Sequence, residues 1–191
     1  MFLLYFKLGV YHILDVFSYD HILFLICLVA VYLIHQWKQI LVLITAFTIG
    51  HTTSLVLATF NVIKISSALV EFLIPLTVFI TGLWNIVSFK DKVEPTTHAV
   101  KYFSALVFGL IHGLGISNYL HSLLLNEKNI AIALFAFNVG IEVGQIFVVG
   151  IIILLNIVVL NVLKLSRKDW VNIFSGAGMG IALTLMLERI P

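Results

Sequence analysis

Long apolar runs dominate this chain of 191 residues and limit what it can fold into. A helix that crosses a bilayer needs about 20 mostly apolar residues. Runs of that kind, separated by short polar or turn-forming stretches, cover residues 20–36, 38–60, 67–89, 97–120, 130–163 and 170–187. Only 10% of the residues are charged, whereas a water-soluble domain has about 25%. We therefore predict an all-α, polytopic membrane helix bundle with about six transmembrane helices, forming a single integral membrane domain over residues 1–191.

The segment before the first run, Phe2–Phe17, is too short and too interrupted to cross a membrane comfortably. We expect a short N-terminal helix that is interfacial or re-entrant. It lacks a small-residue cleavage site, so we do not interpret it as a removable signal peptide. The polar loop 90–97 (KDKVEPTT) contains Pro95, which suits a helix boundary.

The distribution of Lys and Arg predicts the orientation, because cytoplasmic loops carry more of them. The loops after the first, third and fifth spans contain seven: Lys38, Lys90, Lys92, Lys101, Lys164, Arg167 and Lys168. The opposite side contains four: Lys7, Lys64, Lys128 and Arg189. We expect both termini to lie outside the cytoplasm.

Several classes of protein are excluded by what the chain lacks. Its basic residues are dispersed and its net charge is only +2, so we expect no nucleic-acid partner. Cys27 is the one cysteine, which excludes a disulfide framework. The sequence contains no nucleotide-binding loop pattern, so we do not expect this chain to use ATP directly. The oligomeric state cannot be predicted.

Ionisable side chains lie within or beside the apolar runs, where each costs about 2.5–3.5 kcal/mol to insert at a helix centre. Such residues usually face a protein interior and mark a functional site. The set predicted to bind a metal comprises His12, Asp20, His21, His51, His112 and Glu142. At a rise of about 1.5 Å per residue, the polar residues of the first five spans (Asp20 and His21, His51, Glu71, His112 and Glu142) fall in the outer or central layer of the membrane. We therefore predict that they share one site.

A second group of polar residues is predicted to support this site or to line a path to it. It comprises Asp15, Thr48, Glu71, Asn138 and Gln145. Asn138, Glu142 and Gln145 are spaced at i, i+4 and i+7, which places them on one helical stripe. Thr45, Thr48 and Thr52 form a similar stripe in the second span. Both stripes must face protein or water.

Imidazole and carboxylate ligands together suit nickel, zinc, iron or copper. We predict a divalent transition-metal ion, with nickel or zinc favoured. A structural interpretation is preferred for the histidines near loops, which are His35, His98 and His121. Asp20 has a second possible role as the N-cap of its helix. Three G-x-x-x-G pairs, Gly109/Gly113, Gly140/Gly144 and Gly176/Gly180, predict places where helices approach closely.

At these residues the chain resembles the HupE/UreJ family, membrane proteins associated with hydrogenase and urease accessory systems. The matching segments are YHILDVFSYDHILFL, TAFTIGHTTSLVLA, VEFLIP, FGLIHGLGISNYL and FNVGIEVGQ, over residues 9–150. The spacing from His12 to Asp20 is wider than in the better-studied nickel-linked members, which indicates a divergent branch. The resemblance implies that His12, Asp20, His21, His112 and Glu142 handle a metal, and that the protein takes up nickel. We expect it in a bacterial inner (plasma) membrane.

Two functions of different classes fit these features. The first is a permease for a divalent metal ion, in which the imidazoles replace water around the ion. The second is an intramembrane metal-dependent hydrolase or acyl-transfer enzyme that acts on a lipid or a membrane-anchored substrate, with a fixed ion that activates water. A third interpretation, a structural or sensor role for the ion, is also open. A tightly retained, near-stoichiometric ion would favour catalysis, whereas weak and exchangeable binding would favour transport.

Overall fold

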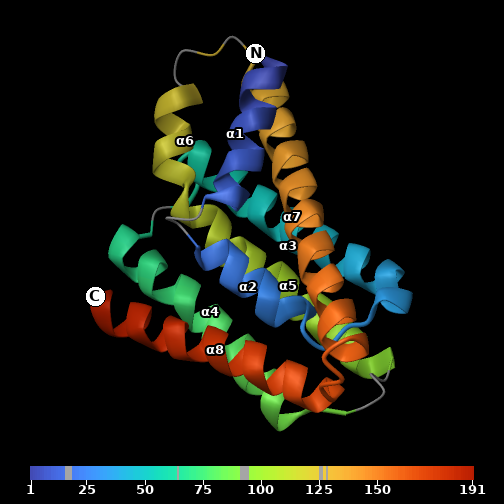
Figure 1. Cartoon of the computed structure of the whole chain (residues 1–191). Coiled ribbons are helices and arrows are strands. Elements are labelled where there is room, and N and C mark those ends of the chain that lie inside the picture. Colours follow the sequence, from blue (N-terminus) through green and yellow to red (C-terminus); the bar gives the residue numbers. More distant parts are fainter. Residues whose placement is uncertain (16–18, 64, 91–94, 125–126, 128) are drawn as a thin grey trace.

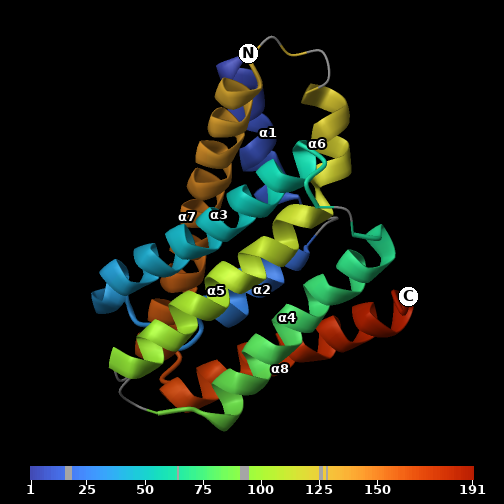
Figure 2. The same cartoon turned by 180° about the vertical axis from the view of Figure 1, so that it is seen from behind.

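The computed structural model describes residues 1–15, 19–63, 65–90, 95–124, 127 and 129–191. These residues form helices and no strand, which confirms the predicted all-α fold. The elements are α1 (Phe2–Leu14), α2 (Asp20–Val29), the short 3-10 helix η1 (Ile34–Gln36), α3 (Trp37–Thr59), α4 (Ser67–Val87), α5 (Pro95–Gly115), α6 (Ser117–Leu124), α7 (Ile130–Asn161) and α8 (Arg167–Glu188). Figures 1 and 2 show that the axes of α2, α3, α4, α5 and α8 have a similar inclination, while α1 lies along α7.

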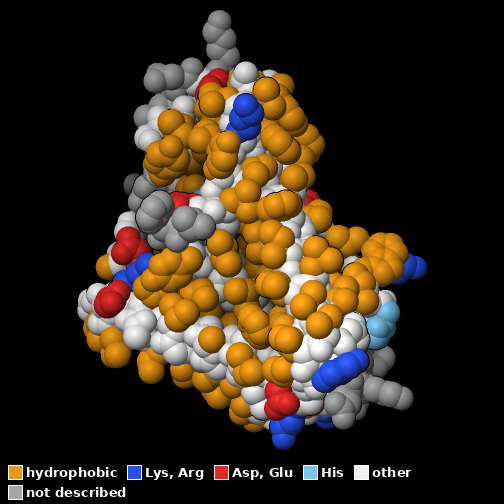
Figure 3. Space-filling view, viewed as in Figure 1, with side chains coloured by type: hydrophobic (Ala, Val, Ile, Leu, Met, Phe, Trp, Pro, Cys, Tyr) orange, Lys and Arg blue, Asp and Glu red, His pale blue; other side chains and the backbone are white. Residues whose placement is uncertain are grey.

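Among the described residues, four helical segments are long and apolar enough to cross a membrane. They are Ile34–Thr59, Ser67–Val87, Ile130–Asn161 and Arg167–Glu188. Helix α7 has 32 residues and is about 48 Å long, which exceeds the hydrocarbon core of about 30 Å. Figure 3 shows hydrophobic side chains over most of the visible face, with the few charged ones mainly toward its margins. The protein is therefore a helical membrane protein.

The first predicted span, residues 20–36, is interrupted in the structure. Helix α2 ends at Val29 after ten residues, about 15 Å, so it reaches only halfway through a membrane. Its terminal carbonyl groups accept hydrogen bonds from other helices: Asn85 Nδ2 donates to Cys27 O (2.6 Å), Trp170 Nε1 to Ala30 O (3.1 Å) and Arg167 Nη2 to Val31 O (2.6 Å). These donors satisfy a helix end that would otherwise be costly to bury.

The predicted span 97–120 also differs, because helix α5 ends at Gly115 and α6 begins at Ser117. Helix α5 is long enough to cross but is not among the four apolar spans. Its apolar character is reduced by His98, Lys101 and His112. Pro95 is its first residue, as the loop pattern predicts.

Lys101 was predicted to lie in a loop, and this is wrong. It lies within α5 and is 8% exposed, so it does not belong to the charges that favour a cytoplasmic loop. Lys64, Lys92 and Lys128, which also enter the predicted orientation, lie outside the described residues. The orientation of the chain remains a prediction.

Close helix pairs organise the bundle, and glycine makes two of them possible. In α5, a Cβ at Gly109 would overlap Phe47 O of α3, and one at Gly113 would overlap His51 O. In α7, a Cβ at Gly140 would overlap Phe6 O of α1. Backbones can approach this closely only where no side chain intervenes. These contacts confirm the first two predicted glycine pairs.

The third pair, Gly176 and Gly180 of α8, does not mark a helix contact. No atom of the described chain lies within 4 Å of a Cβ built at either residue. Helix α8 instead approaches α4 and α2 through Gly178, where an added Cβ would overlap Cys27 Sγ. Spacing alone predicted a contact, but the contact lies on a different face of the helix.

Candidate metal centre

Four histidines from four helices meet in the interior. His12 lies in the last turn of α1, His21 in the first turn of α2, His51 within α3 and His112 near the end of α5. The ring centroids are 4.5 Å apart for His12 and His21, 6.0 Å for His12 and His51, 6.3 Å for His21 and His51, and 5.2 Å for His21 and His112. The predicted convergence of these four side chains is therefore seen in the structure. We call these four residues the histidine cluster.

Three members of the histidine cluster are spaced closely enough to share one ion. One ring nitrogen from each of His12, His21 and His51 lies within 4.8 Å of the other two. His21 and His51 are buried, while His12 is partly exposed. A metal between three imidazoles takes Zn–N distances of about 2.0–2.1 Å, so small side-chain adjustments would close this group around an ion.

Local structure places each imidazole. Helix α1 ends at Leu14, so His12 lies at its last turn, beside the first turn of α2 that carries His21. Gly50 and Gly109 let α3 and α5 touch backbone to backbone, and this contact brings His51 toward the side of the bundle that holds His112. The glycines between α3 and α5 therefore help to position the cluster.

Most ring nitrogens of the histidine cluster lack hydrogen bonds. Within the described chain, both nitrogens of His21 and His51 are buried without a partner, as are Nε2 of His12 and of His112. Nδ1 of His112 lies 2.9 Å from Phe108 O and must carry its proton to donate to this carbonyl, which leaves a lone pair on Nε2. A buried polar group without a partner costs about 1–3 kcal/mol. A bound cation would satisfy several of these nitrogens at once, so the residues fit a metal ion.

Asp20 adjoins the cluster through its neighbour His21. Its Oδ2 pairs with Arg189 Nη1 at 3.1 Å, and the Asp20 side chain is 14% exposed. Its Oδ1 is buried and has no hydrogen-bond partner among the described residues. Its side chain makes no N-cap hydrogen bond to α2, which instead has Tyr19 at the N-cap position. One carboxylate oxygen thus remains for an ion.

Glu142 lies in a row of hydrogen bonds between α3 and α7. Thr45 Oγ1 donates to Glu142 Oε1 (2.8 Å), Thr48 Oγ1 to Gln145 Oε1 (2.9 Å) and Thr52 Oγ1 to Asn138 Oδ1 (2.6 Å). The two polar stripes predicted from spacing therefore face each other. Glu142 is partly exposed and is not in the group of three whose ligand atoms lie within 4.8 Å.

The remaining predicted residues lie around the cluster. Asp15 is the C-cap of α1 and is partly buried. Glu71 of α4 is exposed and lines a cavity of about 410 Å³ with Gly115 and Ser117, at the end of α5 that carries His112. His35 is exposed, and His98 Nδ1 lies 3.2 Å from the Tyr32 hydroxyl, which fits a structural role. The side chain of His121 lies outside the described part of the chain.

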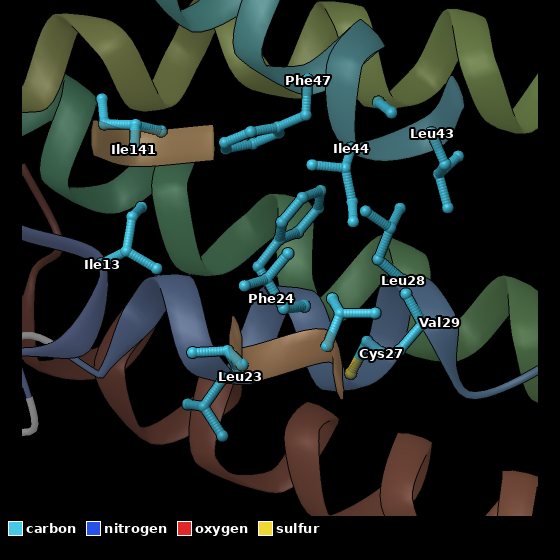
Figure 4. Close-up of a cluster of buried hydrophobic side chains, with 14 of the residues drawn as sticks. Ile13, Leu23, Phe24, Cys27, Leu28, Val29, Leu43, Ile44, Phe47 and Ile141 are labelled. Atoms are coloured by element: carbon cyan, nitrogen blue, oxygen red, sulfur yellow. The ribbon is translucent and has the colours of Figure 1, made fainter. Parts of the chain in front are cut away.

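Two features, one beside the histidine cluster and one away from it, were missed from the sequence. Phe24 and Phe47 cover the cluster on one side: their rings lie 4.9 Å apart and within 5.0 Å and 5.1 Å of His112, and Figure 4 shows them side by side among apolar residues. The other missed feature is the burial of Lys101 against Asn85. Asn85 is the one amide side chain in the apolar run 67–89, which was the available signal.

Comparison with known proteins identifies the family. The family model described as HupE / UreJ protein matches residues 1–189. The chain belongs to the HupE/UreJ family. This match confirms the resemblance seen in the sequence motifs and extends it from α1 to α8. No curated protein and no solved structure matches this HupE/UreJ protein.

Proposed function

We propose that this HupE/UreJ protein transports a divalent transition-metal ion across the membrane, with nickel favoured and zinc as the second choice. The observation that carries the proposal is the group of unpartnered imidazole nitrogens contributed by α1, α2, α3 and α5. Neutral imidazole binds nickel, zinc and copper well. In this proposal the ion is the cargo of the protein and not a resident cofactor.

In this proposal, His12, His21 and His51 replace water around the ion, with His112 and Asp20 beside them. A divalent cation in an apolar interior needs negative charge nearby. Asp20 supplies one carboxylate oxygen that has no hydrogen-bond partner among the described residues. Asp15, which follows the last turn of α1, supplies a second carboxylate near His12.

We propose two polar stretches as parts of the path. The cavity lined by Glu71 lies at the same end of α5 as His112 and offers a water-filled approach. The row formed by Asn138, Glu142 and Gln145 lies against Thr48 and its neighbours, which flank His51 on α3. Gln145 Nε2 is buried and has no hydrogen-bond partner among the described residues, so it keeps a donor that an ion's water shell would engage.

The transport proposal predicts flux in a reconstituted system. Purified protein in liposomes should admit Ni²⁺ or Zn²⁺ well above the leak of protein-free liposomes. His51→Ala should lower this flux at least about tenfold, because a loss of about 1.4 kcal/mol in ion binding is already a factor of ten. An indicator trapped in the lumen measures the flux, and Thr53→Ala, an exposed change two residues away, is the matched control.

Outcomes other than flux separate the alternatives. Purified protein that retains a near-stoichiometric ion and moves none would favour the metal-dependent enzyme. Protein that neither retains nor moves an ion would rule out both the transport and the enzyme interpretations.

A separate prediction concerns Glu142. Glu142→Gln keeps an oxygen that can accept the Thr45 hydrogen bond but removes the charge, so flux should fall about tenfold while thermal stability stays unchanged. Glu142→Ala should lower both flux and stability. Inductively coupled plasma mass spectrometry of cells and unfolding in detergent provide the two measurements. If Glu142→Gln keeps wild-type flux, the charge of Glu142 has no part in transport and the residue serves only helix packing.

A further inference from the structure

A second polar centre lies away from the histidine cluster, where α2, α4, α5 and α8 meet. Lys101 Nζ donates to Asn85 Oδ1 at 2.9 Å, and Asn85 Nδ2 donates to Cys27 O (2.6 Å) and Ser175 Oγ (3.1 Å). Lys101 is 8% exposed, Asn85 1% and Ser175 0%. A lysine buried this deeply in an apolar bundle is costly and is a functional candidate for that reason.

Few groups near the Lys101 ammonium could balance its positive charge. Within the described chain, Asn85 is its one hydrogen-bond partner and no carboxylate pairs with it. Helix α4 presents Asn85, Thr81 and Trp84 to this region, α8 presents Ser175, and α2 presents Leu28 and the carbonyl of Cys27.

The titratable groups near Lys101 are few. Among the described residues they are His98, one turn earlier on α5, Tyr102, whose ring stacks on His98, Tyr32, which is hydrogen-bonded to His98, and the buried thiol of Cys27. None of them supplies a negative charge that would hold the ammonium in place.

Lys101 also lines a cavity of about 40 Å³. That volume holds a few water molecules or one partly hydrated ion, because a single water needs about 10–15 Å³. Two residues of its wall, Phe108 and Leu28, belong to the apolar layer beside the histidine cluster. The Phe108 ring lies 6.1 Å from Phe24, whose ring lies 5.0 Å from His112. One aromatic layer therefore separates the cluster from this cavity.

We propose that Lys101 is a proton-carrying gate on the path of the transported ion. This inference rests on the transport function proposed above. An ion that leaves the histidine cluster past Phe24 and Phe108 arrives beside Lys101. A divalent cation and an ammonium group repel each other strongly in an apolar interior, so both cannot occupy this cavity.

The proton balance of the step is simple. As the ion enters the cavity, one N–H bond of the Lys101 ammonium breaks, the proton passes to water and the electron pair stays on Nζ. That proton leaves toward the histidine cluster, the side from which the ion came. When the ion has left on the other side, the neutral amine takes up one proton from water on that side and again donates to Asn85. No electron transfer occurs, and each ion that passes is exchanged for one proton at Lys101.

The test uses the full protein in liposomes with a Ni²⁺ gradient, a Ni²⁺ indicator and a pH indicator in the lumen. Wild type should couple ion flux to proton movement. Lys101→Arg keeps a permanent positive charge, so flux should fall at least tenfold while Ni²⁺ binding, measured by calorimetry, stays unchanged. Lys101→Met removes the proton site and should allow flux without proton movement. Lys7→Met, on the exposed side of α1, is the control and should match wild type.

A second variant tests the gate independently, in case Lys101→Arg does not fold. Asn85→Asp has nearly the same size and places a carboxylate on the ammonium, which should hold its proton and block flux in the same way. The gate would be overturned, and the transport function would stand, if Lys101→Arg and Asn85→Asp both kept wild-type flux. Proton movement that persists in Lys101→Met would have the same consequence. Wild-type protein that binds Ni²⁺ and moves none would overturn the transport function and the gate together.

Discussion

His21→Ala is expected to weaken the binding of Ni²⁺ or Zn²⁺ by at least about 100-fold, or about 2.7 kcal/mol. The His21 ring has the shortest contact in the histidine cluster, 4.5 Å to His12, and it also contacts His112 at 5.2 Å. Both of its nitrogens are buried and without partners among the described residues. Replacing His21 with alanine therefore removes a proposed metal ligand and breaks no hydrogen bond of its ring among the described residues. Titration calorimetry of the purified protein measures the affinity.

Folding must be separated from binding in this experiment. His21→Gln keeps most of the side-chain volume and should also lose most of the affinity, while its unfolding temperature stays near that of wild type. His35→Ala removes an exposed histidine of η1 and should bind as wild type does. If His21→Ala binds the ion as tightly as wild type does, the ion binds at another place in the protein.

Gly109→Leu is expected to produce the largest loss of stability. A Cβ at this position would overlap Phe47 O, and the His51 backbone nitrogen lies 3.0 Å away. Backbone atoms cannot move aside as a flexible side chain can, so α3 and α5 must separate. Overpacking costs about 1–3 kcal/mol and occasionally more. A loss of about 3 kcal/mol in stability lowers the unfolding temperature by roughly 6–12 °C for a chain of this size.

The same substitution should also impair metal binding, because the contact it breaks holds α3, which carries His51, against α5, which carries His112. Gly180→Leu is the matched control, since no atom of the described chain lies within 4 Å of a Cβ at Gly180. It should unfold at or slightly above the wild-type temperature, because leucine favours a helix more than glycine does. Thermal unfolding in detergent, followed by tryptophan fluorescence, compares the two. Equal unfolding temperatures would mean that α3 and α5 do not depend on this close contact.

Much of the fold could be predicted because membrane helices follow apolar runs. The boundaries of α3, α4, α7 and α8 lie within a few residues of the predicted spans. The meeting of His21, His51 and His112 could be predicted from depth, because helical rise converts a position in the sequence into a depth in the membrane. His12 was included because it lies just upstream of the first span. The facing stripes of α3 and α7 followed from helical periodicity in the same way.

Other features depend on contacts that are remote in the sequence. Residues 20–36 form an apolar run, yet α2 can end at Val29 inside the bundle, since side chains from α4 and α8 satisfy carbonyl groups at its end. Lys101 was counted with the loop after the third span, but Asn85 of α4 accepts its hydrogen bond inside the bundle. Spacing could not show that Gly178 rather than Gly176 and Gly180 faces the neighbouring helices.

The sequence by itself determined that this protein is a bundle of membrane helices and which histidines were candidates for one shared site, because apolar length and helical rise are local properties of the chain. The tertiary structure decided which helix stops halfway, which carboxylates are already engaged and where the lysine lies. Those outcomes depend on partners that are far apart in the sequence, such as Arg189 for Asp20 and Thr45 for Glu142. A buried polar group takes the partner that folding brings to it, and no local pattern encodes that partner.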